Sequence, residues 1–448
     1  MKVLFLEVDT EREWAVASLG PAFVAAFLRR HGHESLFLRV PLTMNADHVA
    51  DRIRSLEPGL LGVSLTTRQW QRARKLIREV RQRVDVPVVT GGLHPTFAPQ
   101  EVLANPGFDY VCLGEGEEAA LELVDALESG RPIAGVRNIW ARGEARPPLR
   151  PPFPSLDDLP FMARDLLDEP NGVVHMSTQR GCPFPCTYCG ARKFHDLYEG
   201  FGQYGRRRSL QNVLDELAQI RARREPHYVI FLDDTFTINH PWVKEFCRAY
   251  GKDIGLPFWI HARVETVNER MLHQLAEAGC RHVTYGVESG SYRIRKEVMR
   301  RPVKNDRFRD VFRWTREAGI TATANYMLGL PEETRDDLQQ TLDLAEELEA
   351  FDFAYFVFYP YPGTHLFNYC LDKGYLPADY LDREANHRES ILSLPTLTQS
   401  DITEYYEKFT KLRERMYEDR ARQHLGADTP VEVLRAATAH VQAAAITG

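Results

Sequence analysis

The chain lacks the features that would place it in a membrane or on a secretory route. None of its 448 residues belongs to an apolar run approaching the roughly 20 residues that span a bilayer. The first residues, Met1–Glu7, indicate a short buried strand and have neither the apolar core length nor the cleavage site of a signal peptide. We therefore expect a cytoplasmic protein with no membrane span.

A basic surface is also missing. The net charge is −7, with 44% hydrophobic and 27% charged residues, which is ordinary for a globular protein. Arginine is locally dense at residues 206–208 and 221–224, but acidic residues surround both stretches. Because nucleic-acid binding needs a basic domain or stripe, we expect helix ends or anion contacts there and no nucleic-acid partner.

Cysteine is scarce. The seven cysteines are an odd number in a long chain, which argues against a disulfide framework and for a reducing compartment. Three lie within residues 181–190. The other four form no second group for an auxiliary cluster and are expected to be buried or idle: Cys112, Cys247, Cys280 and Cys370.

The length suggests two or three domains, because a domain with one hydrophobic core typically has about 150 residues. Residues 1–145 alternate short apolar strands with amphipathic helices, which is typical of an open parallel α/β sheet. The expected strands are 3–8, 35–39, 60–65, 86–90 and 110–113, and the expected helices are 21–31, 72–84 and 117–128. A linker follows over residues 146–171, and its proline-rich part at 146–154 should be stiff and extended.

The alternation resumes over residues 172–396. Strand-like runs occur at 173–177, 228–232, 258–261, 282–287, 321–327 and 353–358, with helices between them, such as 210–223 and 333–349. Six such units predict a partial (β/α)6 barrel that is open on one side, with its active site at the carboxyl ends of the strands. Residues 397–448 indicate a charged helical segment that packs on the barrel. The predicted fold class is thus α/β throughout, with a helical C-terminal segment.

The most informative motif is the loop that follows the first barrel strand. Cys182, Cys186 and Cys189 have the spacing C-x-x-x-C-x-x-C, which differs from the two separated C-x-x-C pairs of zinc sites. Four-iron clusters use four thiolates, so three leave one iron with an open position where chemistry can occur. A zinc loop and three reduced structural thiols remain the alternatives.

This loop, with Arg180 and Gly181 before it and Tyr188 just before the third cysteine, resembles the signature of the radical S-adenosylmethionine (SAM) enzymes. The resemblance implies that the open iron of a [4Fe-4S] cluster binds the amino and carboxylate groups of SAM, and that Tyr188 lies at the SAM site. It implies that the reduced cluster cleaves SAM to a 5′-deoxyadenosyl radical. A reducing partner such as flavodoxin or ferredoxin is then expected.

Two further strand ends carry carboxylates. Asp233 and Asp234 follow the second barrel strand, where burying two like charges is costly without a cationic partner. The resemblance assigns one of them to the SAM amino group, and capping of the next helix is the alternative. Glu288 ends a later strand and is expected to accept hydrogen bonds from ribose hydroxyls, and Arg263 to contact the SAM carboxylate or ribose. For both residues the alternative is a salt bridge at the barrel rim.

Two other barrel motifs match the family in order. Gly329 and Pro331 lie in a turn that resembles the one beneath the adenine of SAM, where backbone approaches a planar ligand closely. Tyr359 and Tyr361 match the family's last strand end and are expected to line the substrate cavity, with simple packing as the alternative.

Several segments of residues 1–145 resemble the cobalamin-binding domain that precedes the barrel in one branch of these enzymes. Glycines after strands let backbone amides approach the phosphate and amide groups of a bulky corrin. The predicted cobalamin-binding residues are Ser18, Leu19, Gly20, Ser64, Thr66, Thr67, Arg68, Gln69, Gly91, Gly92, His94, Gly114, Glu115 and Gly116. The alternative is a vestigial scaffold that binds no corrin.

The chain departs from the cobalamin mutases in one respect. The D-x-H-x-x-G run that supplies a histidine to cobalt there is missing, and His94 is followed by Pro95 and Thr96. We therefore expect cobalamin bound with its own base displaced and no protein histidine in its place. The lower face of cobalt is expected at the loop over residues 65–70.

The resemblance implies a cobalamin-dependent radical SAM enzyme that methylates an unactivated carbon of a small-molecule substrate. One rival uses the same cofactors for cyclisation or ring rearrangement, as does the family's anaerobic cyclase of bacteriochlorophyll synthesis. A second rival is an iron–sulfur electron-transfer or sensor protein. Nothing in the sequence identifies the substrate.

Overall fold

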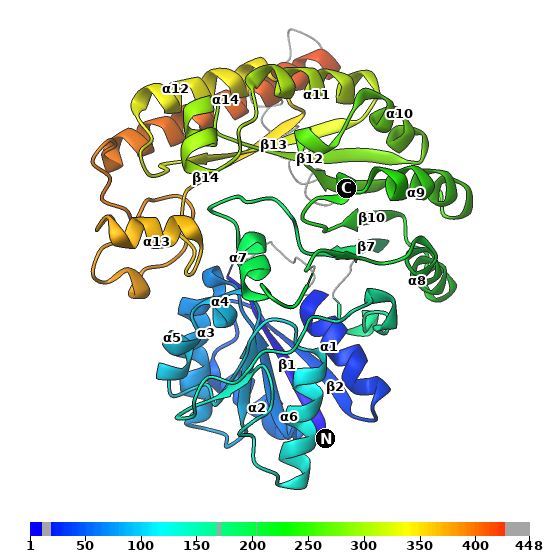
Figure 1. The fold of residues 1–448 in the computed structure, drawn as a ribbon, viewed down its shortest axis with the longest axis vertical. Helices are drawn as coiled ribbons and strands as arrows, with labels where there is room; N and C mark the ends of the chain where they lie inside the picture. The colour runs from blue at the N-terminus through cyan, green and yellow to red at the C-terminus, as the bar shows by residue number, and fades with distance from the viewer. Residues whose placement is uncertain (11–18, 168–171, 203, 426–448) are drawn as a thin grey trace. The chain divides into compact units, whose positions relative to one another are not determined.

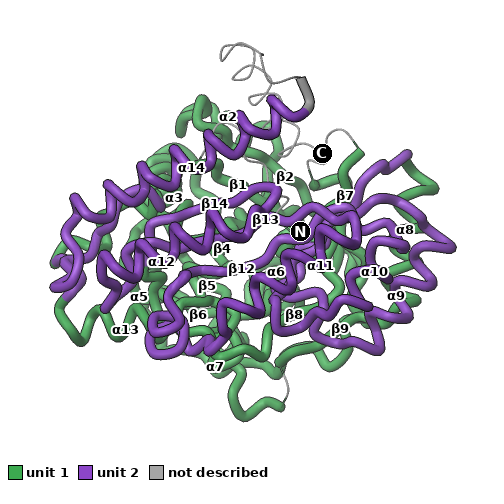
Figure 2. Tube along the Cα trace, turned by 90° about the horizontal axis from the view of Figure 1, so that it is seen from above, with its two compact units in different colours: residues 1–224, 360–374, 378–386 green, residues 225–359, 375–377, 387–448 purple. Residues whose placement is uncertain are grey.

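The chain forms two compact units in its computed structural model. The structure describes residues 1–10, 19–167, 172–202 and 204–425 (Figure 1). Ser18 and parts of the predicted linker and C-terminal segment lie outside these residues. Unit 1 comprises residues 1–224, 360–374 and 378–386, and unit 2 comprises residues 225–359, 375–377 and 387–448 (Figure 2). These units follow contact density, so the domain boundaries given above remain predictions.

Unit 1 is built around a six-stranded sheet in the order β2-β1-β3-β4-β5-β6. The first five strands are parallel and β6 is antiparallel to β5. The predicted open parallel sheet is therefore present, with one antiparallel edge strand that the sequence did not indicate. The strands are β1 (Lys2–Val8), β2 (Glu34–Val40), β3 (Leu60–Ser64), β4 (Val88–Gly91), β5 (Tyr110–Cys112) and β6 (Ile139–Ala141).

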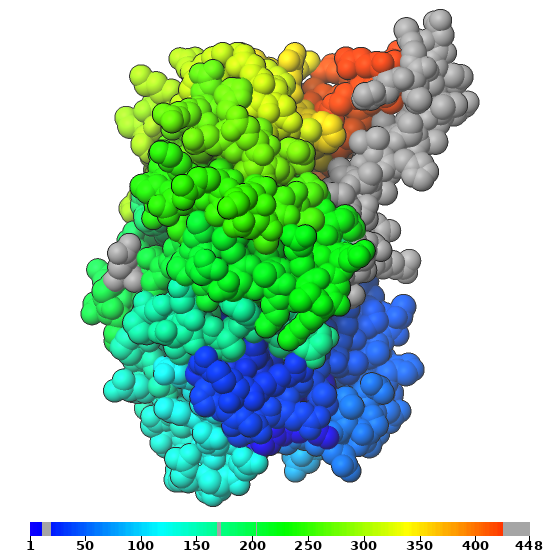
Figure 3. Space-filling model, turned by 90° about the vertical axis from the view of Figure 1, so that its right-hand side faces the viewer, coloured from blue at the N-terminus to red at the C-terminus, as the bar shows by residue number. Residues whose placement is uncertain are grey.

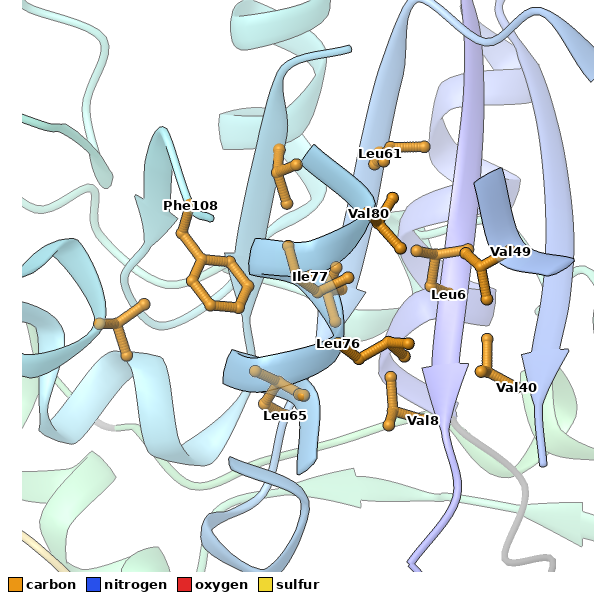
Figure 4. Packing of buried hydrophobic residues seen from close by; sticks show 14 of the residues in the cluster. Leu6, Val8, Val40, Val49, Leu61, Leu65, Leu76, Ile77, Val80 and Phe108 are labelled. Carbon is orange, nitrogen blue, oxygen red and sulfur yellow. The ribbon is translucent and has the colours of Figure 1, made fainter. Parts of the chain in front are cut away.

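Helices cover both faces of this sheet. The helices are α1 (Leu19–Arg30), α2 (Ala46–Leu56), α3 (Thr67–Arg81), α4 (Leu93–Phe97), α5 (Pro99–Ala104) and α6 (Glu117–Ser129). Apolar side chains of α2 and α3, such as Val49 and Ile77, pack on one face against Leu6 and Leu61 (Figure 4). Side chains of α1 and α6 pack on the other face. In the space-filling view, part of the blue N-terminal region is exposed at the surface (Figure 3).

Helix α3 begins five residues before its predicted start at residue 72. Thr66 and Gln69 form a capping box, in which each side chain bonds the backbone of the other residue. The predicted loop over residues 65–70 is thus largely the first turn of α3. This turn was not predicted as helical because its residues are mostly polar, and the apolar periodicity of the helix begins only after them.

The cysteine segment belongs to unit 1. It lies between β8 (Gln179–Arg180) and α7 (Gly190–Leu197), and β8 pairs with β9 (Arg206–Arg207) as an antiparallel ribbon. The unit also contains β7 (Val173–Met176), α8 (Leu210–Arg223) and α13 (His365–Asp372).

Unit 2 contains five parallel strands in the order β14-β13-β12-β11-β10. The strands are β10 (Tyr228–Phe231), β11 (Phe258–Ala262), β12 (Cys280–Glu288), β13 (Thr321–Leu328) and β14 (Asp352–Val357). The helices are α9 (His240–Asp253), α10 (Glu269–Glu277), α11 (Asn305–Glu317), α12 (Arg335–Glu347) and α14 (Gln399–Leu425). Together with β7, these strands confirm the six that the sequence predicts for the barrel.

Helix α14 confirms the predicted charged helical segment as far as residue 425. Its Phe409 lies 5.6 Å from the ring of Tyr326 in β13 and 5.9 Å from that of Phe353 in β14. The helix therefore covers the sheet of unit 2 as an integral part of its core. Within the described residues, no helix has both the length and the apolar character needed to cross a membrane.

Candidate functional site

Four neighbouring strand ends of unit 2 carry the residues that the sequence assigns to SAM. Asp233 and Asp234 follow β10, Arg263 follows β11, Glu288 ends β12 and Gly329 follows β13. Because parallel strands end at the same edge of a sheet, the fold brings these residues to one edge of unit 2.

The two aspartates differ in exposure. Asp233 is buried, whereas Asp234 is open to solvent. Although its side chain reaches solvent, the protein atoms packed around the Asp234 carboxylate desolvate it, and this desolvation and the like charge of Asp233 raise the pKa of Asp234 to about 6. Helix α9 is capped by Asn239, whose side chain accepts a hydrogen bond from the backbone of Trp242 at 3.1 Å. The short 3-10 turn Phe236–Ile238, which comes before α9, begins at Thr235, so neither aspartate is the N-cap residue of either helix.

Glu288 and Arg263 belong to a network of charges at the same edge. Arg301 is almost fully buried and donates to the carbonyl of Gly286 at 2.6 Å and to Glu265 at 3.0 Å. Its guanidinium lies 3.8 Å from the Glu288 carboxylate, and Arg263 also pairs with Glu265. Both predicted SAM contacts therefore have ionic neighbours, as the salt-bridge alternative requires.

In this network, both arginines interact mainly with one carboxylate, that of Glu265. Although desolvation opposes ionisation, Arg301 and Arg263 lower the pKa of Glu265 to about 2. Glu265 is thus the main counter-ion of Arg301. Glu288 stands outside this pair, at a register shift in β12 and with a φ of 72°, a conformation that side-chain-bearing residues rarely adopt. Its carboxylate lies at the carboxyl end of β12, the edge where the predicted ribose contact would be made.

The Gly329 turn is held by a carboxyl group that the sequence analysis did not single out. The backbone N–H groups of Gly329 and Leu330 donate to Oε2 of Glu333 at 2.7 and 3.0 Å. Glu333 is fully buried, and its desolvation raises its pKa to about 8. Gly329 has a φ of 78°, and a Cβ there would lie 3.0 Å from Ile402 of α14. The only signal in the sequence was that Glu333 lies in the same motif, four residues after Gly329.

The cysteine segment is fixed at several points within unit 1. Cys186 is buried, and Cys182 and Cys189 are half-buried; all seven cysteines are free of disulfides. The backbone of Leu366 donates to the carbonyl of Thr187 at 2.9 Å. Gly181 has a φ of 86° and lies so close to Tyr204 that a Cβ would be 2.7 Å from its ring. Three thiols in one braced loop are the soft donor set that an iron–sulfur cluster requires.

The predicted cobalamin residues lie along the carboxyl edge of the sheet in unit 1. Ser64 ends β3, Gly91 ends β4, and Gly114 follows β5. The sheet order reverses direction between β1 and β3, and ligands of open α/β sheets bind at such a switch point. Thr66 and Arg68 lie beside this point, and Leu19 and Gly20 begin α1.

Local packing explains two of the glycines at this edge, whereas a Cβ on Gly20 would meet nothing within 4 Å. A Cβ on Gly92 would lie 2.8 Å from the carbonyl oxygen of Leu65, and one on Gly114 would lie 2.1 Å from the hydroxyl of Tyr198. These two glycines were predicted to allow the approach of a corrin. The protein itself already requires them, because each faces a neighbouring protein group.

Other members of the predicted cobalamin set are engaged within the protein. Gln69 accepts a hydrogen bond from the backbone of Thr66 at 2.8 Å and donates to the carbonyl of Val8 at 3.1 Å. Glu115 pairs with Arg206 and Arg180, and Gly116 is the residue before α6. These contacts shape the edge of the sheet, and direct cobalamin contacts by these residues remain predictions.

His94 is a core residue. Its ring stacks on Trp70 with 4.8 Å between centroids, and Nδ1 lies 3.3 Å from the hydroxyl of Thr67. Nε2 is 3.7 Å from the Glu101 carboxylate, to which Trp70 also donates a hydrogen bond. Burial and, to a smaller extent, the charge of Arg74 lower the pKa of His94 to about 3. A neutral imidazole in this setting packs in the core, and a contact of His94 with cobalamin remains a prediction.

The two predicted cavity tyrosines fall in different units. Tyr359 is buried in unit 2, with its ring 6.4 Å from that of His387. Tyr361 belongs to unit 1, where burial raises its pKa to about 12 against the opposing charge of Arg68. Tyr361 is therefore close to the end of the sheet that is predicted to bind cobalamin. Tyr188, Pro331 and the other predicted SAM contacts lie in described segments, and their contacts with SAM remain predictions.

Family comparisons agree with this layout. Residues 176–345 match the radical SAM superfamily, and residues 10–124 match the B12 binding domain. An uncharacterized methyltransferase of Pyrococcus horikoshii is 30% identical over 394 residues, which are 83% of this chain and 83% of that protein. The anaerobic magnesium-protoporphyrin IX monomethyl ester cyclase of Rubrivivax gelatinosus is 26% identical over 400 residues, covering 83% of this chain and 70% of the cyclase.

Among solved structures, the radical S-adenosylmethionine methyltransferase TsrM from Kitasatospora setae, with tryptophan substrate and a SAM analog bound, has a similar fold. The TM-score is 0.70 at 18% identity, and the match covers 92% of this chain and 89% of TsrM. At this level of identity the likeness concerns the fold.

Proposed function

Since the chain belongs to the radical SAM enzymes that carry an N-terminal cobalamin-binding domain, we propose that it methylates an unactivated carbon of a small molecule. One observation carries the proposal: the cysteine segment and the carboxyl edge of the cobalamin-type sheet share one compact unit. The hydroxyl of Tyr198, next to α7, accepts a hydrogen bond from the backbone of Glu115 at 2.8 Å. The segment for the cluster is thus joined directly to the edge for the corrin.

The proposal gives roles to residues of both units. Cys182, Cys186 and Cys189 hold a [4Fe-4S] cluster through their thiolates. Asp233 or Asp234 binds the ammonium of SAM, a role that suits neighbouring carboxylates in need of a cationic partner. When bound, the cofactors supply a 5′-deoxyadenosyl radical and a transferable methyl group. The protein orients the reactants and keeps water away from the radical.

The remaining SAM contacts follow the strand ends. Glu288 accepts hydrogen bonds from ribose hydroxyls, and Arg263 contacts the carboxylate or ribose. The turn at Gly329 and Pro331 presents backbone to the adenine, and Glu333 keeps that turn in place through its two accepted hydrogen bonds.

One face of the unit 2 sheet carries half-buried side chains that suit an uncharged substrate. Ile260 of β11 and Val283 of β12 are buried on one face, and Trp259, His261 and His282 are half-buried on the other. Burial lowers the pKa of both histidines to about 4, so both are neutral at neutral pH. We infer that the part of the substrate on this face is uncharged and forms hydrogen bonds.

A cyclase or ring-rearranging reaction is the second candidate. The relative from Rubrivivax gelatinosus carries the name of a cyclase and matches this chain over 400 residues. Both candidates use the same cofactors and a substrate radical, so they differ in product rather than in the predicted protein contacts.

The test begins with protein reconstituted anaerobically with iron, sulfide and hydroxocobalamin. Reduced flavodoxin or ferredoxin and SAM should then yield 5′-deoxyadenosine, and a co-encoded pathway metabolite should gain the mass of one methylene. Cys182→Ala should abolish both products, whereas Cys247→Ala should not, because Cys247 is a buried thiol on α9. Cleavage without a mass gain would favour cyclisation. If wild-type protein fully loaded with cluster and cobalamin cleaved no SAM, the remaining interpretation would be an iron–sulfur electron-transfer or sensor protein.

A further inference from the structure

A four-residue loop of unit 1 contacts the chain on both sides of the cysteine segment. This loop, Gly114–Glu117, links β5 to the start of α6 and will be termed the brace loop. Arg180, which directly precedes Gly181 and Cys182, contacts it from one side. Tyr198, which follows α7, contacts it from the other.

The first contact neutralises an unfavourable pair of charges. Arg180 and Arg206 are directly opposite each other in the β8–β9 ribbon. Like charges in this position destabilise a two-stranded pair. Each strand is only two residues long, so the ribbon has few hydrogen bonds to offset the repulsion. An external source of negative charge is therefore needed.

The brace loop supplies that charge. Arg180 donates to Glu117 and lies 3.4 Å from Glu115, and Arg206 donates to Glu115 through two nitrogens. Glu117 is 3% exposed and Glu115 11%, so these are ion pairs shielded from water. Although desolvation opposes it, the charges of Arg180 and Arg206 lower the pKa of Glu115. Removing one partner from such a pair is costly because it leaves a buried charge uncompensated.

The second contact depends on shape. The Tyr198 hydroxyl accepts the backbone N–H of Glu115 and occupies the space where a Cβ of Gly114 would lie, 2.1 Å away. Its ring also stacks on Tyr204, with 4.9 Å between centroids. The end of α7 is thereby attached to the same loop as Arg180.

We propose that the brace loop positions the cysteine segment through Glu117, Glu115 and Gly114. It thereby couples the conformation of the cobalamin site to that of the cluster site. Both ends of the segment, at Arg180 and at Tyr198, are tied to one loop that lies at the predicted corrin edge. Any ligand that orders this loop also orders the cysteine segment, and the linkage is reciprocal. Glu117 and Glu115 are positioning residues, since they act through Arg180 and Arg206. This coupling rests on the proposed function only in taking cobalamin as the ligand of that edge.

The first test uses protein without cofactors. Hydrogen–deuterium exchange is measured on peptides covering residues 181–198 in Glu117→Gln and in Glu118→Gln. Glu118 is the matched control because it is the next residue of α6 and is half-exposed, with Arg150 3.6 Å away. Loss of a buried charge-assisted hydrogen bond should speed exchange in these peptides about tenfold or more in Glu117→Gln, and not in the control. Equal exchange in both variants would overturn the positioning role.

Arg180→Lys covers the case in which Glu117→Gln does not fold. It keeps the positive charge but loses the forked guanidinium that reaches both carboxylates, so exchange over residues 181–198 should again rise. Exchange as slow as in wild type would count against the proposal.

The second test adds hydroxocobalamin to the same cluster-free proteins. It should slow exchange over residues 181–198 in wild type and in Glu118→Gln, and much less in Glu117→Gln. The same slowing in all three would disprove coupling through the brace loop. If wild type bound no cobalamin, the proposed function would fail and the coupling with it, while the positioning role would still be decided by the first test.

Discussion

The buried carboxyl group of Glu333 gives the protein a pH dependence that can be worked out from its surroundings. Its Oε2 accepts two backbone hydrogen bonds from the Gly329 turn, whereas Oε1 is buried with no hydrogen-bond partner among the described residues. The two N–H donors favour the ionised form, but burial disfavours it more strongly. In the folded protein at neutral pH, the Glu333 carboxyl group therefore keeps a proton on Oε1.

The sign of the effect follows from where the proton is bound. The pKa of Glu333 rises from 4.5 to about 8 on folding, so between these values the folded chain holds a proton that the unfolded chain has lost. The free energy of unfolding then falls as pH rises through this window, by up to about 1.4 kcal/mol per pH unit. The full effect of this one group is at most about 5 kcal/mol, and it is reached near pH 8.

Glu333→Gln should remove this dependence. The amide has the shape of the protonated acid, keeps an acceptor for the Gly329 turn and cannot ionise. Near pH 5 the variant should match wild type within about 1 kcal/mol. Towards pH 8 it should become more stable than wild type by several kcal/mol, because the wild-type carboxyl must by then hold its proton or bury a charge.

Urea unfolding of cofactor-free wild type and Glu333→Gln at pH 5 to 9 gives the difference between their free energies of unfolding. The contributions of all other titrating groups cancel in this difference. Asp336→Asn is the control, since Asp336 is an exposed carboxyl in the same segment. Its difference from wild type should not change with pH. If Glu333→Gln also showed a constant difference, the raised pKa and the reasoning from burial would both be wrong.

Three further predictions follow from the sites. Glu288→Gln should weaken SAM binding about ten- to hundredfold while the fold holds, because Arg301 keeps Glu265 as its counter-ion; unchanged affinity by calorimetry would make Glu288 a structural residue. His94→Ala should cost about 2–4 kcal/mol of stability through a cavity beside Trp70, yet leave the electron paramagnetic resonance of cob(II)alamin without nitrogen splitting, as in wild type. Gly114→Ala should lower the melting temperature and speed exchange at the end of α7, since its Cβ would overlap Tyr198; an unaffected variant would contradict that contact.

The fold was predictable where hydrophobic pattern alone decides structure. Strands β1 and β3 are buried on both faces and give short apolar runs, and the barrel strands were also located from their strand-like runs. Strand β6 was missed because its three residues give no pattern, and its antiparallel pairing depends on the chain's return path. The start of α3 was missed because it depends on a capping box rather than on apolar spacing.

The site was predictable only as far as its local motifs. The cysteine spacing and the strand-end carboxylates stand within short segments, and each could be read in isolation. Their partners could not: Glu117 and Arg180 are 63 residues apart in the chain, and Arg301 is 36 residues from Glu265. Pairings of this kind are set by the fold, and no local pattern in one sequence reveals them.

The glycines at the corrin edge show how one sequence signal can have two causes. A glycine after a strand is equally suited to a ligand and to a close protein neighbour, and Gly92 and Gly114 have such neighbours in Leu65 and Tyr198. These glycines therefore cannot be counted as evidence for cobalamin, which rests on family membership and on the switch point of the sheet. They have a different value. Because Gly114 admits the Tyr198 hydroxyl, the conformation of the predicted corrin edge and the position of the cysteine segment cannot vary independently.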